Sequence, residues 1–287
     1  MMPICRRSVI IGSQTPYGDY LLGVEEDLKT IRAYQLSLPG GAWMEGEQVF
    51  LLNPTVAQVL RTIGSTVADY VFVYFSGHGY TNQSGQRMLC LTDGDLSDIS
   101  LLTPSQRQLL LVDACRTFGE KPPARIGAIS PGEEDRIYGV AHLQARMQFD
   151  GYIARSPAGT MIVHSTAHGE LAYDDLYGNG GLSTLALMGA VNKMLHTWPG
   201  KQVLITEAIG EAARLLRTWG VQQVPSIAYE TGHLAVPFGI AVPAFNAAPR
   251  PKMLVRQPQN AGLPGFAVFA GIALSLYAIS KLTEIIE

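Results

Sequence analysis

The chain has 287 residues, of which 47% are apolar and 16% are charged, and its net charge is −3. This length supports one large domain, or two small ones, with a sizeable core. The sequence has no long basic run, which excludes nucleic acid as the main partner because phosphate binding needs a cluster of cations.

The chain begins with an apolar run that is too short for a signal peptide. The first 240 residues alternate short apolar runs with amphipathic stretches, a pattern typical of an α/β fold with a mostly parallel sheet. The predicted strands cover 8–13, 49–53, 69–80, 87–93, 109–115, 161–166 and 226–230. The predicted helices cover 23–36, 54–64, 140–149, 182–196 and 203–219. Asn53 is expected to cap the second helix and Pro54 to begin it.

Two predicted segments differ from the regular pattern. The strand at 87–93 is expected to be more exposed than the others. Residues 117–137, with their prolines and glycines, predict an exposed loop, and long loops in compact domains are usually functional.

The carboxyl-terminal segment 262–280 carries no charge over nineteen residues, about the length that spans a bilayer core. We therefore expect three parts: a folded domain over 1–242, a proline-bearing linker over 243–261 and a transmembrane anchor over 262–282. The alternative is a helix buried in the core.

The residues around this segment predict its orientation and packing. Cations precede it, so we expect the folded domain to lie on the cytoplasmic side of a single-pass anchor. Small residues recur every fourth position within it, which predicts self-association of the anchor. The cations are Arg250, Lys252 and Arg256, and the small residues are Ala267, Gly271 and Ser275.

Two predicted strands end in reactive side chains, "VFVYFSGHG" in His78 and "LLLVDAC" in Cys115. Ligands of open α/β sheets bind beyond the carboxyl ends of the strands, so neighbouring strands would bring both residues to one crevice. A thiol near an imidazole can become a thiolate nucleophile at neutral pH. Gly77 and Gly79 allow a sharp turn around the histidine and leave a backbone N–H free for an oxyanion.

The remaining cysteines and histidines carry less chemistry. Cys5 and Cys90 are interpreted as packing residues, and the three cysteines of the chain, with no C-x-x-C pair, indicate a reducing compartment. The histidines interpreted as structural or surface groups are His164, His168 and His233. No metal site is expected.

Together, "YFSGHG" and "LLLVDACR" resemble the caspase-like cysteine proteases, which include caspases, metacaspases and bacterial relatives. The resemblance extends over residues 8–235. It implies a three-layer caspase-like fold, a His78–Cys115 dyad, and an oxyanion hole made by the backbone N–H groups of Gly79 and Cys115. No cofactor is implied, although some metacaspases depend on calcium; the aspartates of 93–98 are interpreted as a solvated loop.

The resemblance also predicts specificity. Asp113 stands where caspases have a glutamine, and Asp174 stands where they have a pocket arginine. The second pocket arginine, placed two residues before the "G-x-x-x-D" helix start, is matched by Leu21. An acidic pocket predicts a peptide substrate with arginine or lysine before the scissile bond, because a buried carboxylate needs a cation.

Three readings of the function follow from the sequence. The first is a membrane-anchored cysteine endopeptidase, for which the resemblance implies a role in regulated proteolysis, cell death or defence. Such an enzyme would cut its own predicted loop after Arg125 or Arg136, unless these are ordinary solvated charges. The second is a catalytically silent caspase-like adaptor that recruits partners to a membrane. The third is a related cysteine hydrolase or transamidase.

Overall fold

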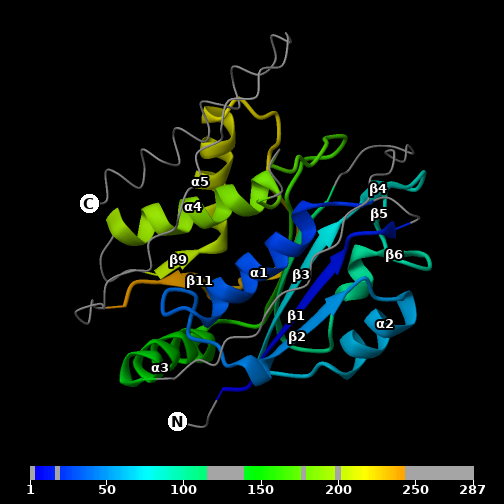
Figure 1. Ribbon diagram of the computed structural model, residues 1–287. Helices are drawn as coiled ribbons and strands as arrows, with labels where there is room; N and C mark the ends of the chain where they lie inside the picture. Colours follow the sequence, from blue (N-terminus) through cyan, green and yellow to red (C-terminus); the bar gives the residue numbers. More distant parts are fainter. Residues whose placement is uncertain (1–3, 17–19, 115–138, 176–178, 198–201, 243–287) are drawn as a thin grey trace.

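The computed structural model describes residues 4–16, 20–114, 139–175, 179–197 and 202–242 (Figure 1). Its centre is a six-stranded sheet in the order β10-β8-β7-β3-β1-β2. The strands are β1 (Arg6–Ser13), β2 (Gln48–Leu52), β3 (Tyr70–Gly77), β7 (Arg107–Asp113), β8 (Gly159–His164) and β10 (Ser226–Gly232). All neighbours run parallel except β10, which pairs antiparallel with β8 at one edge. The prediction of a mostly parallel central sheet is confirmed.

Helices cover both faces of this sheet (Figure 1). Successive residues of a strand point to opposite faces, so the apolar run of β7 supplies two cores. Leu109 and Leu111 pack with one set of helices, and Leu110 and Val112 pack on the other side. The first set is α1 (Gly23–Leu36), α3 (Val140–Arg155), α4 (Leu182–Thr197) and α5 (Ile205–Thr218). The other side holds α2 (Val56–Ser65) and the 3₁₀ helix η3 (Asp98–Leu101).

Two small antiparallel sheets complete the described fold. One contains β4 (Gly79–Thr81), β5 (Arg87–Cys90) and β6 (Asp95–Ser97) in that order. The other pairs β9 (Gln202–Leu204) with β11 (Pro237–Ile240). A short 3₁₀ helix, η2 (Glu45–Glu47), precedes β2.

These small sheets correct three predictions. The strand expected over 69–80 ends at Gly77, and the residues after His78 form β4, because they pair with β5 instead of with the central sheet. The strand expected to be more exposed is largely buried, with Leu89 only 1% exposed. The helix expected from residue 203 begins at Ile205, since Val203 and Leu204 belong to β9.

The start of α2 is also corrected. Thr55 caps the helix, not Asn53: its hydroxyl accepts from the Gln58 N–H at 3.2 Å, and the Gln58 side chain accepts from the Thr55 N–H at 2.8 Å. Such a reciprocal capping box satisfies two helix-end donors at once. Asn53 has a positive φ of 50° and instead accepts from the Gln14 N–H at 2.7 Å.

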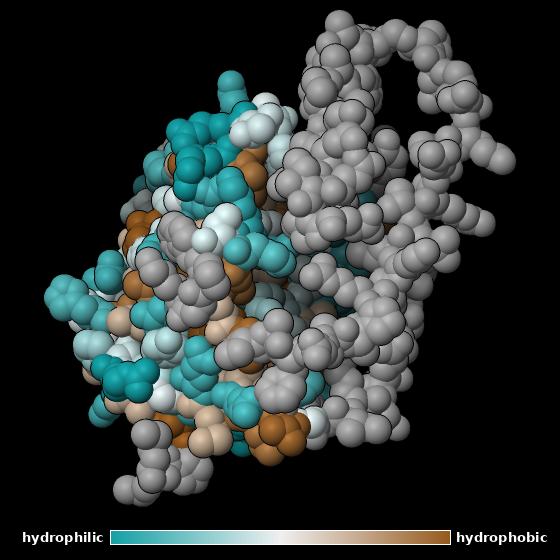
Figure 2. Space-filling view, turned by 90° about the vertical axis from the view of Figure 1, so that its left-hand side faces the viewer, coloured by the Kyte–Doolittle hydropathy of each residue, from teal (hydrophilic) through white to brown (hydrophobic). Residues whose placement is uncertain are grey.

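Several predictions concern residues outside the described ranges: Cys115, the loop at 117–137, the linker and the anchor segment 262–282. Within the described residues, no helix has both the length and the hydropathy needed to cross a bilayer. The described surface seen in Figure 2 mixes hydrophilic and hydrophobic side chains. The division at residue 242 stays a prediction.

Candidate active site

The site lies at the carboxyl edge of the central sheet, where β3 and β7 end side by side. Their parallel register pairs Ser76 with Asp113, the last paired residues of the two strands. His78 follows Ser76 by two positions, and Cys115 follows Asp113 by two positions in the sequence. The two strands are neighbours, which is the condition for a shared crevice, whereas Cys115 itself lies outside the described residues.

Two glycines hold the chain around His78. A Cβ added at Gly77 would lie 2.9 Å from the Ser13 carbonyl oxygen, and one at Gly79 would lie 2.8 Å from the Met88 carbonyl oxygen. Both positions therefore need glycine for close backbone approach. The His78 carbonyl accepts from the Cys90 N–H at 3.0 Å, so β5 fixes the histidine's backbone while the residue itself is half-buried.

A buried arginine links this turn to the end of β7. Arg87, 3% exposed, lies in β5 and donates from Nη2 to the Ala114 carbonyl oxygen. Gly79 lies against the same place, since its added Cβ would be 3.3 Å from both Ala114 Cβ and Arg87 Nη2. The histidine turn and the residue before Cys115 are thus packed together.

Two buried aspartates meet beside this edge. Asp27 of α1 accepts from the Ser76 hydroxyl at 2.8 Å and from the Gly181 N–H at 2.7 Å. Asp113 accepts from the Thr184 hydroxyl at 2.7 Å. A Cβ at Gly181 would stand 2.7 Å from Asp113 Oδ2 and 3.2 Å from Asp27 Oδ2, so one glycine separates the two carboxyls.

Asp174 adds a third carboxyl at the rim, and we call Asp27, Asp113 and Asp174 the acidic cluster. Asp174 is exposed, bridges to Gly181 and accepts from the Gly23 N–H at the start of α1. Gly181 immediately precedes α4, so the amino ends of α1 and α4 both face the cluster. The positive end of a helix dipole stabilises negative charge there.

The environment raises the pKa of every carboxyl in the acidic cluster. Burial, followed by repulsion from Asp113, raises the pKa of Asp27 well above its ordinary value. Burial also raises the pKa of Asp113, against the hydrogen bonds from Thr184 and Ser165. Desolvation by the surrounding protein, followed by repulsion from Asp113, raises the pKa of Asp174 to about 6. Because Asp174 is open to water, solvent screening weakens its interaction with a nearby charge. Asp27 and Asp113 are buried, so their interactions with a charge are stronger.

Asp27 is the site residue that the sequence analysis missed. The "G-x-x-x-D" landmark contains it, but no role followed from the spacing, and the pocket position was matched to Leu21 instead. Leu21 packs partly buried against the apolar core. The available signal was a carboxylate on the otherwise apolar inner face of a helix, since Asp27 lies between the buried Val24 and Leu28.

A cavity behind Asp113 is too small for a substrate side chain. Its volume is about 30 Å³, enough for a water molecule, and Tyr74, Asp113 and Thr184 supply polar lining.

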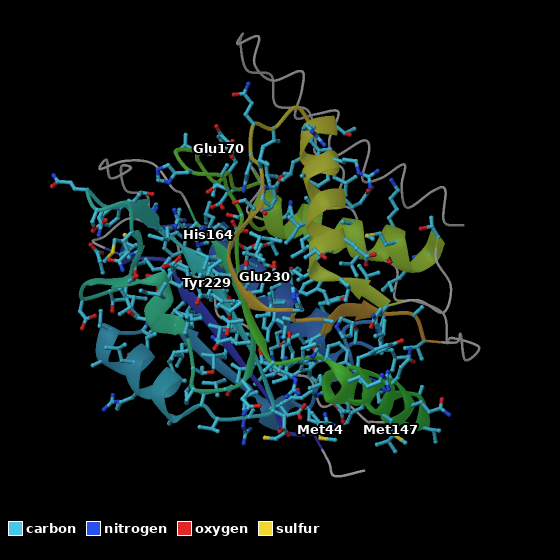
Figure 3. All side chains as sticks on the ribbon, turned by 180° about the vertical axis from the view of Figure 1, so that it is seen from behind. Met44, Met147, His164, Glu170, Tyr229 and Glu230 are labelled. Atoms are coloured by element: carbon cyan, nitrogen blue, oxygen red, sulfur yellow. The ribbon has the colours of Figure 1, made fainter. Side chains whose placement is uncertain are left out.

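The aspartates of 93–98 do not form the solvated loop that was expected. Asp93 accepts from the Val56 N–H at 2.7 Å, and Asp95 accepts from the Tyr80 hydroxyl at 2.8 Å. Asp98 is buried against His164 Nε2 at 2.8 Å, which confirms the structural reading of His164, on β8 near the middle of Figure 3. In the described part of the chain, no three His, Cys, Asp or Glu residues are arranged to hold a metal ion.

Solved structures share this fold. Protein GSU0716 from Geobacter sulfurreducens has 16% identity and a TM-score of 0.53, with 82% of this chain and 99% of that chain covered. Caspase-1 from Spodoptera frugiperda has 15% identity and a TM-score of 0.53, with 85% and 94% covered. At these identities the likeness shows the fold alone, and that fold is caspase-like.

The family follows from a second comparison. The model of the caspase domain family matches residues 28–231, so the chain belongs to the caspase family. Membership points to cysteine peptidase activity on protein substrates, and caspase-type proteases need no cofactor. No curated protein matches the sequence.

Proposed function

We propose that the chain is a cysteine endopeptidase that cleaves peptide bonds after arginine or lysine. The acidic cluster beside His78 carries this proposal. A substrate cation would offset part of the negative charge of the three carboxyls, whereas a substrate aspartate would add a fourth carboxyl to the cluster. Arginine fits best among natural side chains because its planar guanidinium can bind a carboxylate through two hydrogen bonds.

In the proposed mechanism Cys115 is the nucleophile and His78 is the general base and acid. His78 removes the thiol proton, and the thiolate forms a bond to the scissile carbonyl carbon. The backbone N–H groups of Gly79 and Cys115 are the proposed donors to the oxyanion. His78 then protonates the leaving amine as the C–N bond breaks, and water hydrolyses the acyl-enzyme.

An arginine-ending peptide probe with an electrophilic carbonyl tests this proposal. We expect wild-type protein to be labelled on Cys115, His78→Ala to lose labelling and an otherwise identical aspartate-ending probe to label poorly. Folded wild-type protein that resists the probe would favour the non-catalytic adaptor. Product analysis with an added amine separates hydrolysis from transamidation.

Self-cleavage is a further part of the proposal. Arg125 and Arg136 are candidate sites in the segment between β7 and α3. We expect mass spectrometry to find cleavage after one of them in active wild-type protein and not in Cys115→Ala. An intact wild-type chain under conditions that cleave a peptide substrate removes this part.

We also propose that residues 262–282 anchor the protein in a membrane with the protease domain in the cytoplasm. The support is the uncharged segment 262–280 and the cations that precede it. Full-length protein is expected in the membrane fraction, and detergent is expected to release it. Recovery in the soluble fraction without detergent would contradict the anchor.

A further inference from the structure

Thr184 joins Asp113 to a buried tyrosine. The Thr184 hydroxyl donates to Asp113 Oδ2 at 2.7 Å, and Tyr74 Oη lies 2.7 Å from Thr184 Oγ1. A threonine hydroxyl has one hydrogen to donate. Since Thr184 gives that hydrogen to Asp113, Tyr74 is the donor to Thr184, and the hydrogen bonds run from Tyr74 through Thr184 to Asp113.

The backbone of Thr184 reinforces the same contact. Thr184 is the third residue of α4, and its N–H also donates to Asp113. Asp113 thus occupies the amino end of α4 as a capping side chain would, although it comes from β7. Both hydrogen bonds favour the ionised carboxylate, whereas burial opposes it.

The three residues of this relay are well enclosed. Tyr74 is 2% exposed, Thr184 is 3% and Asp113 is 8%. The other charged groups that act on or respond to Asp113 are Arg87 from β5, Asp27 from α1 and Asp174 at the rim. Low local dielectric makes each hydrogen bond in such a place stronger, and makes an unmade one more costly.

We propose that Tyr74 and Thr184 are positioning residues that hold the Asp113 carboxyl in one orientation, and so make the proposed protease prefer arginine over lysine. The inference rests on the proposed function. The Thr184 hydroxyl holds Oδ2, and the Thr184 N–H and the Ser165 hydroxyl also donate to Asp113. Together these hydrogen bonds set the plane of the carboxylate, and a planar guanidinium can match it. Lysine presents a single ammonium that needs no such plane, so it gains less from the fixed orientation.

Steady-state cleavage of matched arginine and lysine peptides between pH 5.5 and 8.5 tests the relay. Thr184→Val removes the hydroxyl and keeps the backbone N–H, and we expect it to raise KM for the arginine peptide about tenfold with little change in kcat. It should also lower the arginine-to-lysine ratio and move the acid limb of kcat/KM to higher pH. Thr184→Ser should restore all three, and Tyr74→Phe should shift them in the direction of Thr184→Val by about threefold.

The control is Thr218→Val in α5, where the lost hydroxyl bonds only the Arg214 carbonyl at the exposed end of a helix. It should leave the ratio and the pH profile unchanged. If Thr184→Val does not fold, Tyr74→Phe against Thr184→Ser decides: equal ratios and equal pH profiles overturn the inference.

Binding of agmatine, a small guanidinium compound, to full-length protein at pH 7.5 separates the two proposals. Wild-type protein that neither binds agmatine nor cleaves after arginine overturns the proposed specificity, and the relay with it. Wild-type protein that does both, while Thr184→Val keeps the same agmatine affinity, arginine-to-lysine ratio and acid limb, overturns the relay alone.

Discussion

The two ends of the central sheet each hold a cluster of charges, and the clusters differ in balance. At the amino edge, Arg6 and Arg146 meet Glu47 and Asp150, which we call the mixed cluster. Arg146 Nη1 donates to Glu47 Oε2 at 2.8 Å, and Arg6 Nε lies 3.4 Å from Asp150 Oδ1. At the carboxyl edge, the acidic cluster holds three carboxyls. Among the described residues, Arg87 is the cation that acts on Asp113, so the negative charges outnumber the positive ones.

The pKa of a carboxyl responds differently at the two ends. Burial alone would raise the pKa of Glu47, but its hydrogen bond from Arg146 and the charge of Arg6 bring that pKa below its usual value. Burial and mutual repulsion leave the pKa of Asp27 raised. Figure 3 labels residues near both clusters. Met147, next to Arg146 in sequence, lies with Met44 at the bottom of the view, and Glu170, from the loop leading to Asp174, lies near the top. Charge is balanced where the chain needs only stability, and unbalanced where we propose that a cation from outside binds.

The largest effect is expected from breaking the balance of the mixed cluster. Arg6→Met leaves Glu47 and Asp150 facing Arg146 alone, and removes the cation that stacks 4.7 Å from the Trp43 ring centroid. We expect a loss of about 3–5 kcal/mol in the free energy of unfolding, measured with denaturant. Arg32→Met is the control, since its 3.5 Å pair with Glu45 is solvent-exposed and should cost under about 1 kcal/mol. Equal losses in the two variants would contradict the contrast.

Removing a charge from the acidic cluster should lower activity without lowering stability. Asp113→Asn keeps the shape of the side chain and removes one carboxylate from a group of like charges. We expect kcat/KM for arginine peptides to fall about a hundredfold, the size expected for losing a buried charge pair. The thermal midpoint at pH 8 should not fall. An unchanged preference for arginine would contradict the role of Asp113.

The pH dependence should separate the clusters further. Asp27 and Asp113 have raised pKa values, and that of Asp174 is about 6, so acid neutralises the cluster and weakens binding of a substrate cation. Between pH 7.5 and 5.5 we expect about a tenfold fall in arginine-peptide cleavage relative to alkylation of Cys115 by iodoacetamide, which reports the thiol without the pocket. A constant ratio would refute this.

The same raised pKa values predict a pH-dependent stability. A carboxyl whose pKa is higher folded than unfolded imposes no cost below its unfolded value near 4. The cost grows as pH rises toward the folded value. Asp113→Asn should therefore gain stability over wild type as pH increases from 4 to 8, and a difference that is flat with pH would count against a raised pKa of Asp113.

The smallest effect is expected at the rim. Asp174→Asn removes a carboxyl that is exposed to water, so screening limits its influence. We expect about a threefold fall in kcat/KM for arginine peptides, well below that for Asp113→Asn. A larger fall in kcat/KM than that of Asp113→Asn would contradict the smaller contribution expected from Asp174.

The sequence predicted the central sheet well because burial and periodicity are local signals. Helix 23–36 was placed at its observed ends, and the apolar runs predicted both strands that end near His78 and Asp113, although not that they are neighbours. The strand past His78 was wrong because residues 79–81 continue the extended pattern but pair with β5. A local pattern does not say which sheet receives a strand.

The acidic cluster could be predicted only in part. Asp113 and Asp174 followed from a resemblance, and the structure brings them together with Asp27, which the sequence analysis missed. The role of Asp27 depends on Gly181, whose N–H it accepts. That pairing joins residues 154 positions apart in the sequence, and no local periodicity encodes it. The cap of α2 failed for a different reason, since Pro54 is a good first helical residue but Thr55 and Gln58 form the better reciprocal pair.

The hydrogen bond between Asp27 and Gly181 also has a consequence for the order of assembly. The two residues are separated by 154 positions, so their contact closes a long loop and forms late in folding. During synthesis, Asp27, Ser76 and Asp113 leave the ribosome before the segment that carries Gly181 and Thr184 exists. A nascent chain therefore lacks a complete acidic cluster until α4 has docked. On the proposed function, the enzyme would acquire its choice of substrate only once the segment that carries Gly181 and Thr184 is in place.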